Sequence, residues 1–148
     1  MDKRGVTLIE LIIVVAIIGI LAMIAVPAYI GQQKSAARTE AYSNLQNLRL
    51  LEEQYFAENG CYYMDGSPAA CTNATRTGVA QIQSNVNGDP FLRGFKPGSS
   101  PSFTYKITTN STGAGGGTAS CFVATATGNT SRVSGDTFTI DCNNTRNF

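Results

Sequence analysis

The sequence contains 148 residues, with 11 Lys and Arg against 10 Asp and Glu and no histidine. That length accommodates one ordinary domain and excludes a large multidomain enzyme, while a formal net charge of +1 makes nucleic acid an unexpected partner. Without histidine, the chain cannot form Ser-His or Cys-His nucleophile pairs or imidazole metal sites. We therefore predict that it is not an enzyme and needs no metal or other cofactor.

The first predicted element is a long apolar helix that begins near Val6. Leu11–Val26 has no charged residue, and the longer stretch Val6–Val26 has one, Glu10. At 1.5 Å per residue the longer stretch is about 31 Å long as a helix, close to the thickness of a bilayer's hydrocarbon core. Lys3 and Arg4 precede it and favour a cytoplasmic N-terminus. The sequence therefore predicts a single membrane span with the C-terminus outside.

Hydropathy alone leaves three interpretations of this segment open. The segment is compatible with a secretory signal peptide that is cut among the small residues around Pro27, with a plain membrane anchor, and with a helix that leaves the membrane and packs elsewhere. Glu10 also has two interpretations. Thr7 and Glu10 have the spacing of a capping box at a helix start, whereas a carboxylate within a membrane helix is a functional candidate.

Residues 3–32 resemble the N-terminus of type IV prepilins. The resemblance rests on the short basic leader, on Gly5 followed by Val-Thr-Leu-Ile-Glu, and on the apolar run LIIVVAIIGILAMIAVPAY, which includes Gly19 and Pro27. In that family a prepilin peptidase cuts after this glycine and methylates the new amine. The resemblance therefore implies that residues 1–5 are a leader peptide and that Gly5 is the processing site.

Val6 would become the first residue after processing, and the family more often has Phe at this position. Its α-amine, with a reference pKa near 8, is mostly cationic at neutral pH, and Glu10 is the only carboxylate nearby. The resemblance implies that Glu10 of an incoming subunit pairs with the Val6 amine of a neighbour as the helix moves from the bilayer into a filament core. We therefore interpret Val6 and Glu10 as assembly residues, with capping as a compatible second role of Glu10.

Gly19 and Pro27 lie inside this helical run. Pro27 lacks an N–H donor and disfavours helix at the preceding residue, which predicts a bend or a loosening, and the alternative is a boundary where a membrane helix ends. The resemblance implies that filament helices are partly unwound between Gly19 and Pro27. We therefore assign these two residues to helix flexibility, and residues 6–27 to the transmembrane and filament-core helix.

Residues 28–59 are predicted to continue as an amphipathic helix that ends at the Asn59-Gly60 stop signal. Apolar and small residues recur every three or four positions, and the charged residues are expected mostly away from this stripe. We expect the stripe to pack on the chain's own sheet, with Leu45, Leu48 and Leu51 in the core. The stripe consists of Ala37, Ala41, Leu45, Leu48, Leu51 and Tyr55, and the charged residues are Arg38, Glu40, Arg49, Glu52 and Glu53.

The remainder of the chain is predicted to form a small antiparallel sheet. Residues 60–101 are rich in Gly, Asn, Ser and Pro, and we expect them to form a disulfide-containing surface loop. Apolar and polar residues alternate over 102–108, 120–127 and 136–142, which predicts three strands. A sheet packed on one helix is an α+β fold, and the resemblance implies the pilin fold, with a C-terminal disulfide loop within 102–148.

The cysteines Cys61, Cys71, Cys121 and Cys142 permit three disulfide connectivities. They contain no C-x2-C pair, so zinc is not expected. We favour Cys61 with Cys71, which closes a short loop, and Cys121 with Cys142, which ties the second strand to the chain's last residues. The resemblance supports the second pair, since many pilins close a C-terminal loop in this way. One or more free thiols is the alternative.

The resemblance predicts a structural subunit of a type IV pilus, with the major pilin as the favoured assignment. The subunit would lie in the inner membrane before assembly and in an extracellular filament afterwards. Its implied partners are other copies of itself, the prepilin peptidase, the pilus assembly ATPase and the inner-membrane platform. The alternatives are a type II secretion pseudopilin, and a secreted or membrane-anchored binding module whose N-terminus is a signal peptide or an anchor.

Overall fold

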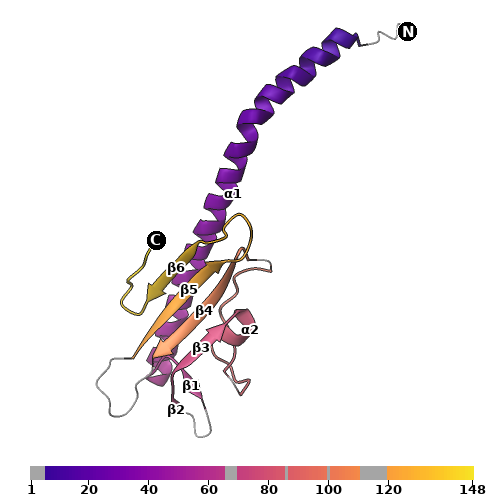
Figure 1. The fold of residues 1–148 in the computed structure, drawn as a ribbon. Coiled ribbons are helices and arrows are strands. Elements are labelled where there is room, and N and C mark those ends of the chain that lie inside the picture. Colours follow the sequence, from indigo (N-terminus) through magenta and orange to yellow (C-terminus); the bar gives the residue numbers. More distant parts are fainter. Residues whose placement is uncertain (1–5, 66–69, 86, 100, 111–119) are drawn as a thin grey trace. The chain divides into compact units, whose positions relative to one another are not determined.

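A computed structural model describes residues 6–65, 70–85, 87–99, 101–110 and 120–148 of the chain. The chain divides into two compact units, Met1–Ala36 and Ala37–Phe148, which we call the stem and the head. One long helix contributes residues to both units. In chain order the elements are α1 (Leu8–Asn59), β1 (Met64–Asp65), β2 (Ala70–Cys71), β3 (Ala74–Thr77), α2 (Val79–Ile82), β4 (Phe103–Asn110), β5 (Cys121–Gly128) and β6 (Thr137–Asp141) (Figure 1).

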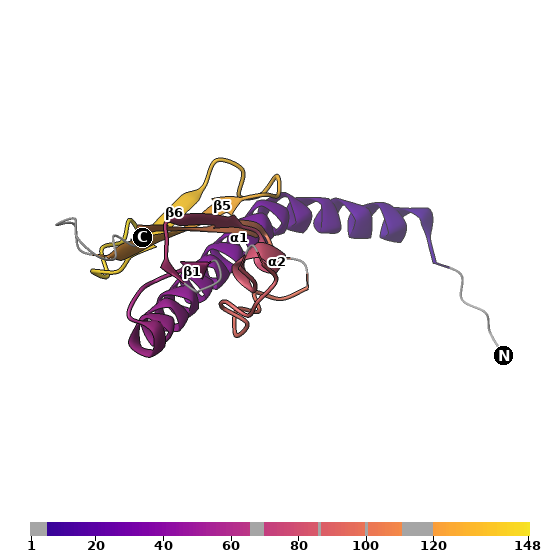
Figure 2. The same cartoon turned by 90° about the horizontal axis from the view of Figure 1, so that it is seen from below.

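The head contains a four-stranded antiparallel sheet with the strand order β3-β4-β5-β6, and a two-stranded sheet of β1 and β2. β4 and β5 pair along their whole length, from Phe103 opposite Gly128 to Asn110 opposite Cys121. The residues of α1 that belong to the head lie along one face of the larger sheet (Figure 2). A long helix against a small antiparallel sheet is an α+β arrangement, so the predicted fold class is confirmed.

The three strands predicted at 102–108, 120–127 and 136–142 correspond to β4, β5 and β6. The sheet has a fourth strand, β3, which the sequence did not predict. Its four residues, Ala-Thr-Arg-Thr, are too few to give a clear alternation, and β3 exists because it pairs with β4, from Ala74 opposite Thr109 to Thr77 opposite Lys106. The prediction of a three-stranded sheet was therefore one strand short.

The region 60–101 contains β1, β2, β3 and α2, whereas the sequence predicts a surface loop there. Six of its large apolar side chains are buried in the core of the head, and the first disulfide also lies in this region. Long segments without regular structure are uncommon in small domains, which agrees with this arrangement. These side chains are Tyr62, Tyr63, Ile82, Phe91, Leu92 and Phe95.

The core of the head forms between α1 and one face of the sheet, where buried and exposed residues alternate along β4. The buried residues of α1, Ala41, Leu45, Leu48 and Glu52, recur at the spacing of one helix face. Leu45 and Leu48 are thus core residues as predicted, and Leu51 is half-buried. The charged residues were expected mostly away from the stripe, and Glu52 is an exception, because its position four residues after Leu48 places it on the buried face.

The free edge of β6 is covered by the residues that follow it in the chain. Ile140 forms a β-bridge with Arg146, on the side of β6 opposite to β5. The side chain of Asn147 accepts a hydrogen bond from the N–H of Thr139 at 2.8 Å and donates one to the carbonyl of Thr137 at 3.2 Å. The last residues of the chain therefore act as a partial extra strand on this edge.

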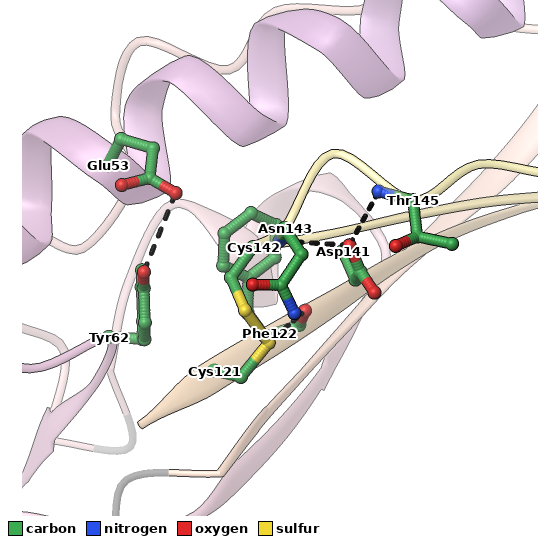
Figure 3. The surroundings of a disulfide bond; sticks show 8 residues. All are labelled: Glu53, Tyr62, Cys121, Phe122, Asp141, Cys142, Asn143 and Thr145. Carbon is green, nitrogen blue, oxygen red and sulfur yellow. Dashed lines mark hydrogen bonds between the residues drawn. A yellow bond between two sulfur atoms is a disulfide. The ribbon is translucent and has the colours of Figure 1, made fainter. Parts of the chain in front are cut away.

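A disulfide between Cys121 and Cys142 connects the start of β5 to the residue after β6, with the two Cα atoms 5.4 Å apart (Figure 3). Next to it, Asp141 Oδ1 accepts hydrogen bonds from the backbone N–H groups of Asn143 at 2.9 Å and Thr145 at 2.7 Å. These bonds form a tight turn directly after the disulfide. The turn returns the chain to the edge of β6.

Within the stem, α1 continues without interruption through Gly19 and Pro27. A Cβ placed on Gly19 would meet nothing within 4 Å, so packing inside one subunit does not require glycine there. At the other end of the helix, Gly60 has φ 76°, and its N–H donates to the carbonyl of Phe56 at 2.7 Å. The predicted stop at Asn59-Gly60 is thus confirmed, since a left-handed glycine terminates helices in this way.

Candidate processing and assembly site

The N-terminal end of α1 is closed by reciprocal hydrogen bonds between Thr7 and Glu10. The backbone N–H and the hydroxyl of Thr7 both donate to Glu10 Oε2, each at 2.8 Å. In return, the N–H of Glu10 donates to Thr7 Oγ1 at 3.3 Å. This is a capping box, which satisfies N–H groups that have no partner within the first turn of a helix. The capping role predicted for Glu10 is therefore present in the single subunit.

The same bonds hold the Glu10 carboxylate toward the beginning of the chain. Val6, the residue predicted to carry the new α-amine, directly precedes Thr7 and is 78% exposed. Gly5 and the rest of the predicted leader lie outside the described residues, so their placement does not contribute to the site. The structure therefore shows an oriented carboxylate next to an accessible residue, and the processing at Gly5 and Val6 stays a prediction.

The stem beyond this site consists of exposed apolar side chains. Its large apolar residues from Leu8 to Ile30 are all more than half exposed, and α1 is long and apolar enough to cross a membrane. Burying one such side chain is worth about 1.5–3 kcal/mol, so a stem of this kind in water would be strongly unfavourable. The stem requires lipid or other protein chains around it.

Four cysteines were singled out in the sequence, and the structure joins them in two disulfides, Cys61 with Cys71 and Cys121 with Cys142. This is the pairing that the sequence favoured. The first disulfide connects the segment after α1 to β2 with a Cα–Cα distance of 5.9 Å. Both disulfides lie in the head. One constrains the segment after α1, and the other constrains the segment after β6.

Sequence reasoning missed an ion pair that connects α1 to the residue directly before β6 within the head. Arg38 donates through Nε and a terminal nitrogen to the two carboxylate oxygens of Asp136, both at 2.8 Å. These hydrogen bonds to Asp136 raise the pKa of Arg38 above its ordinary value. The two residues are 98 positions apart, and no local pattern marks them as partners.

The chain combines a basic leader sequence, a capped apolar helix with one carboxylate near its start, and a small disulfide-bonded antiparallel sheet, which together resemble a pilin-like subunit. The family model described as a prokaryotic N-terminal methylation motif matches residues 1–26. The resemblance to type IV pilins is thereby supported at the residues that first suggested it.

Three relatives, two type IV major pilins and one type II secretion protein, are similar to this chain. The type IV major pilin protein PilA of Myxococcus xanthus is 51% identical over 60 residues, covering 40% of this chain and 27% of its own length. A type IV major pilin protein PilE1 of Neisseria gonorrhoeae is 35% identical over 86 residues, covering 58% of this chain and 47% of its own. The type II secretion system core protein G of Pectobacterium carotovorum is 35% identical over 60 residues, covering 40% of this chain and 38% of its own length.

The chain thus spans less than half the length of each of these relatives. No solved structure matches it. The comparisons support the type IV pilin resemblance through the N-terminal region, and the structure adds the α+β fold. What the whole protein assembles into and binds is taken up as a proposal.

Proposed function

We propose that this chain is the structural subunit, and the major pilin, of a type IV pilus, cut after Gly5 and polymerised through its N-terminal helix. The observation that carries the proposal is Glu10, an oriented carboxylate near the start of the exposed apolar run Val6–Val26, which contains no other charged residue. Type IV major pilins among its relatives support the same function.

The physical argument begins with the exposed stem. Before assembly the bilayer solvates the apolar side chains, and in a filament the stems of other copies take over that role. The Glu10 carboxylate then needs a partner, because an unpaired charge among apolar stems is costly. The cationic amine of Val6 on a neighbouring copy would supply that partner and set the register between subunits.

The proposal includes the remaining assignments from the sequence. Residues 1–5 are the leader, residues 6–27 span the inner membrane and then fill the filament core, and Gly19 and Pro27 let that helix unwind. The prepilin peptidase, the assembly ATPase and the inner-membrane platform are its partners before it enters the extracellular filament. The protein has no enzymatic role in this proposal, and its head forms the filament surface.

The first test is the N-terminal residue of the native protein, determined by mass spectrometry in sheared cell-surface and membrane fractions. The proposal expects a chain that begins at Val6 in the sheared material. A start at Tyr29 would instead show a secreted domain released by a signal peptidase. An intact Met1 found only in membranes would show a simple anchored protein.

Three variants separate the two roles of Glu10. Glu10→Gln keeps a side chain that fits the capping box but removes the charge, so we expect processed subunits in the membrane and no sheared filaments. Thr7→Ala removes the two capping hydrogen bonds of the hydroxyl but keeps the carboxylate, so filaments should persist. Glu40→Gln, at an exposed position of α1 in the head, is the matched control. Normal filaments from Glu10→Gln would contradict the assembly role.

The second candidate function is that of a type II secretion pseudopilin, which the relation to core protein G favours. A pseudopilin would also begin at Val6 and depend on Glu10. It would differ in the fraction where the polymer is found, because only an external pilus is released by shearing. Processed protein that stays with the cell envelope and supports secretion would favour this alternative.

A further inference from the structure

Glu52 is a charged residue type at a fully buried position of the head. It lies on the face of α1 that packs against the sheet, and its exposed fraction is 0%, as for Leu45 and Leu48. Neither carboxylate oxygen has a hydrogen-bond partner in the described part of the chain. Nothing in the proposed processing or assembly of the protein uses this residue.

Among the described residues, no Lys or Arg forms an ion pair with Glu52. On α1, Arg49 precedes it by three residues and its Nε is also without a hydrogen-bond partner in the described residues, while Glu53 follows it. Tyr55 and Tyr62 lie close enough for Glu52 to affect their hydroxyl groups, and Tyr62 donates to Glu53 at 3.5 Å (Figure 3).

In the part of the chain that the structure describes, Glu52 is the only charged residue at a buried position, so the sheet adds no buried charge. The buried positions of β4 and β5 are aromatic, aliphatic or threonine side chains, and the threonine hydroxyl is already bonded to Ala74. These buried residues are Phe103, Tyr105, Ile107 and Thr109 on β4, and Phe122, Ala124 and Ala126 on β5. The carboxyl of Glu52 is thus enclosed by largely apolar groups.

A carboxylate in such surroundings is much more costly than a neutral carboxyl, because burial removes the water that stabilises its charge. Loss of solvent, followed by the nearby charge of Glu53, raises the pKa of Glu52 well above its ordinary value. The unfolded chain exposes Glu52 to water, where its pKa returns to about 4.3. Folding therefore binds a proton over the interval between these two pKa values.

We propose that Glu52 is a pH-sensitive element of the head, which holds a proton in the folded state and weakens the packing of α1 on the sheet when it loses that proton. The direction follows from proton linkage. Below the ordinary pKa of Glu, both states are protonated and the full stability is present. As the pH rises toward the folded-state pKa, the unfolded state binds fewer protons than the folded state, so stability falls.

The composition of the chain makes this effect measurable. The protein has no histidine, and its four cysteines are in disulfides. Between about pH 6 and pH 8, ordinary Asp, Glu, Tyr and Lys side chains do not change their charge. The α-amine does titrate near this range, but it belongs to the stem. A pH dependence of head stability in this range therefore reports on Glu52.

The test is guanidinium unfolding of the full chain in detergent micelles, followed by the near-ultraviolet circular dichroism of the Tyr and Phe side chains in the head. For one proton, the unfolding equilibrium constant should rise about tenfold per pH unit while the pH lies between the two pKa values. Glu52→Gln has a similar size and cannot ionise, so its unfolding should not depend on pH in this range. Glu53→Gln, the half-buried neighbour, should keep most of the dependence.

A wild-type head whose stability is constant over this range would overturn the proposal, as would an equal pH dependence in Glu52→Gln. Infrared difference spectra of the folded wild-type protein provide a measurement that does not require the variant to fold. A protonated carboxyl band that disappears at high pH, and is absent in Glu52→Leu or Glu52→Gln, is the expected result. A fully ionised carboxylate at neutral pH would contradict it.

Discussion

Leu48 and Leu50 form a natural comparison, because they are two residues apart on α1 but differ in burial. Leu48 has an exposed fraction of 0% and belongs to the core between α1 and the sheet, whereas Leu50 is 63% exposed. Replacing either one by Ala has the same effect on helix propensity. The difference between the two variants therefore isolates what burial contributes to the stability of the head.

The expected magnitudes follow from this difference in exposure. Leu48→Ala removes buried methyl groups and leaves a cavity against a rigid sheet, which should lower the free energy of unfolding by about 3 kcal/mol. Leu50→Ala should change it by less than about 0.5 kcal/mol. For a domain of this size, about 3 kcal/mol corresponds to a fall of roughly 1 M in the guanidinium midpoint.

Guanidinium unfolding of the full chain in micelles, at fixed pH, measures both variants under the same conditions. Similar slopes of the two transitions would show that both variants expose the same surface area when they unfold. Equal midpoints for the two variants would refute the packing of α1 on the sheet described above. A larger loss for Leu50→Ala would instead indicate that the opposite face of the helix is buried.

Two further predictions concern the covalent and ionic links of the head. Asp136→Asn should lower the free energy of unfolding modestly and weaken its dependence on salt, because the ion pair with Arg38 is partly exposed. Equal salt dependence in both proteins would contradict this. Replacing Cys121 and Cys142 by Ser should lower the free energy of unfolding by about 3.3 kcal/mol, because the disulfide closes the longer loop. The same replacement of Cys61 and Cys71 should lower it by about 2.7 kcal/mol. Calorimetry that shows the reverse order would argue against loop entropy as the cause.

Local sequence patterns were sufficient to predict the elements that depend on interactions between residues close together in the chain. The capping box at Thr7 and the stop at Gly60 each depend on residues within one or two helical turns, and the apolar run Val6–Val26 is continuous in the sequence. The alternation along β4 and β5 is likewise visible within eight residues. For these elements, the sequence and the structure agree.

The features that were missed depend on partners far away in the chain. β3 is a strand because β4 pairs with it, and Arg38 reaches Asp136 across 98 residues. The spacing of Glu52 predicts a buried position, whereas its charged residue type predicts an exposed one. The packing of the head shows that the side chain is buried. Residue type was a poorer guide than periodicity at this position.

The chain segment that covers the edge of β6 has a consequence for protein solubility. An uncovered edge strand presents N–H and C=O groups that can join the sheet of another molecule and start aggregation. The bridge between Ile140 and Arg146 and the bonds of Asn147 occupy this edge. With these groups occupied, this edge of the sheet is protected from pairing with the sheet of another molecule.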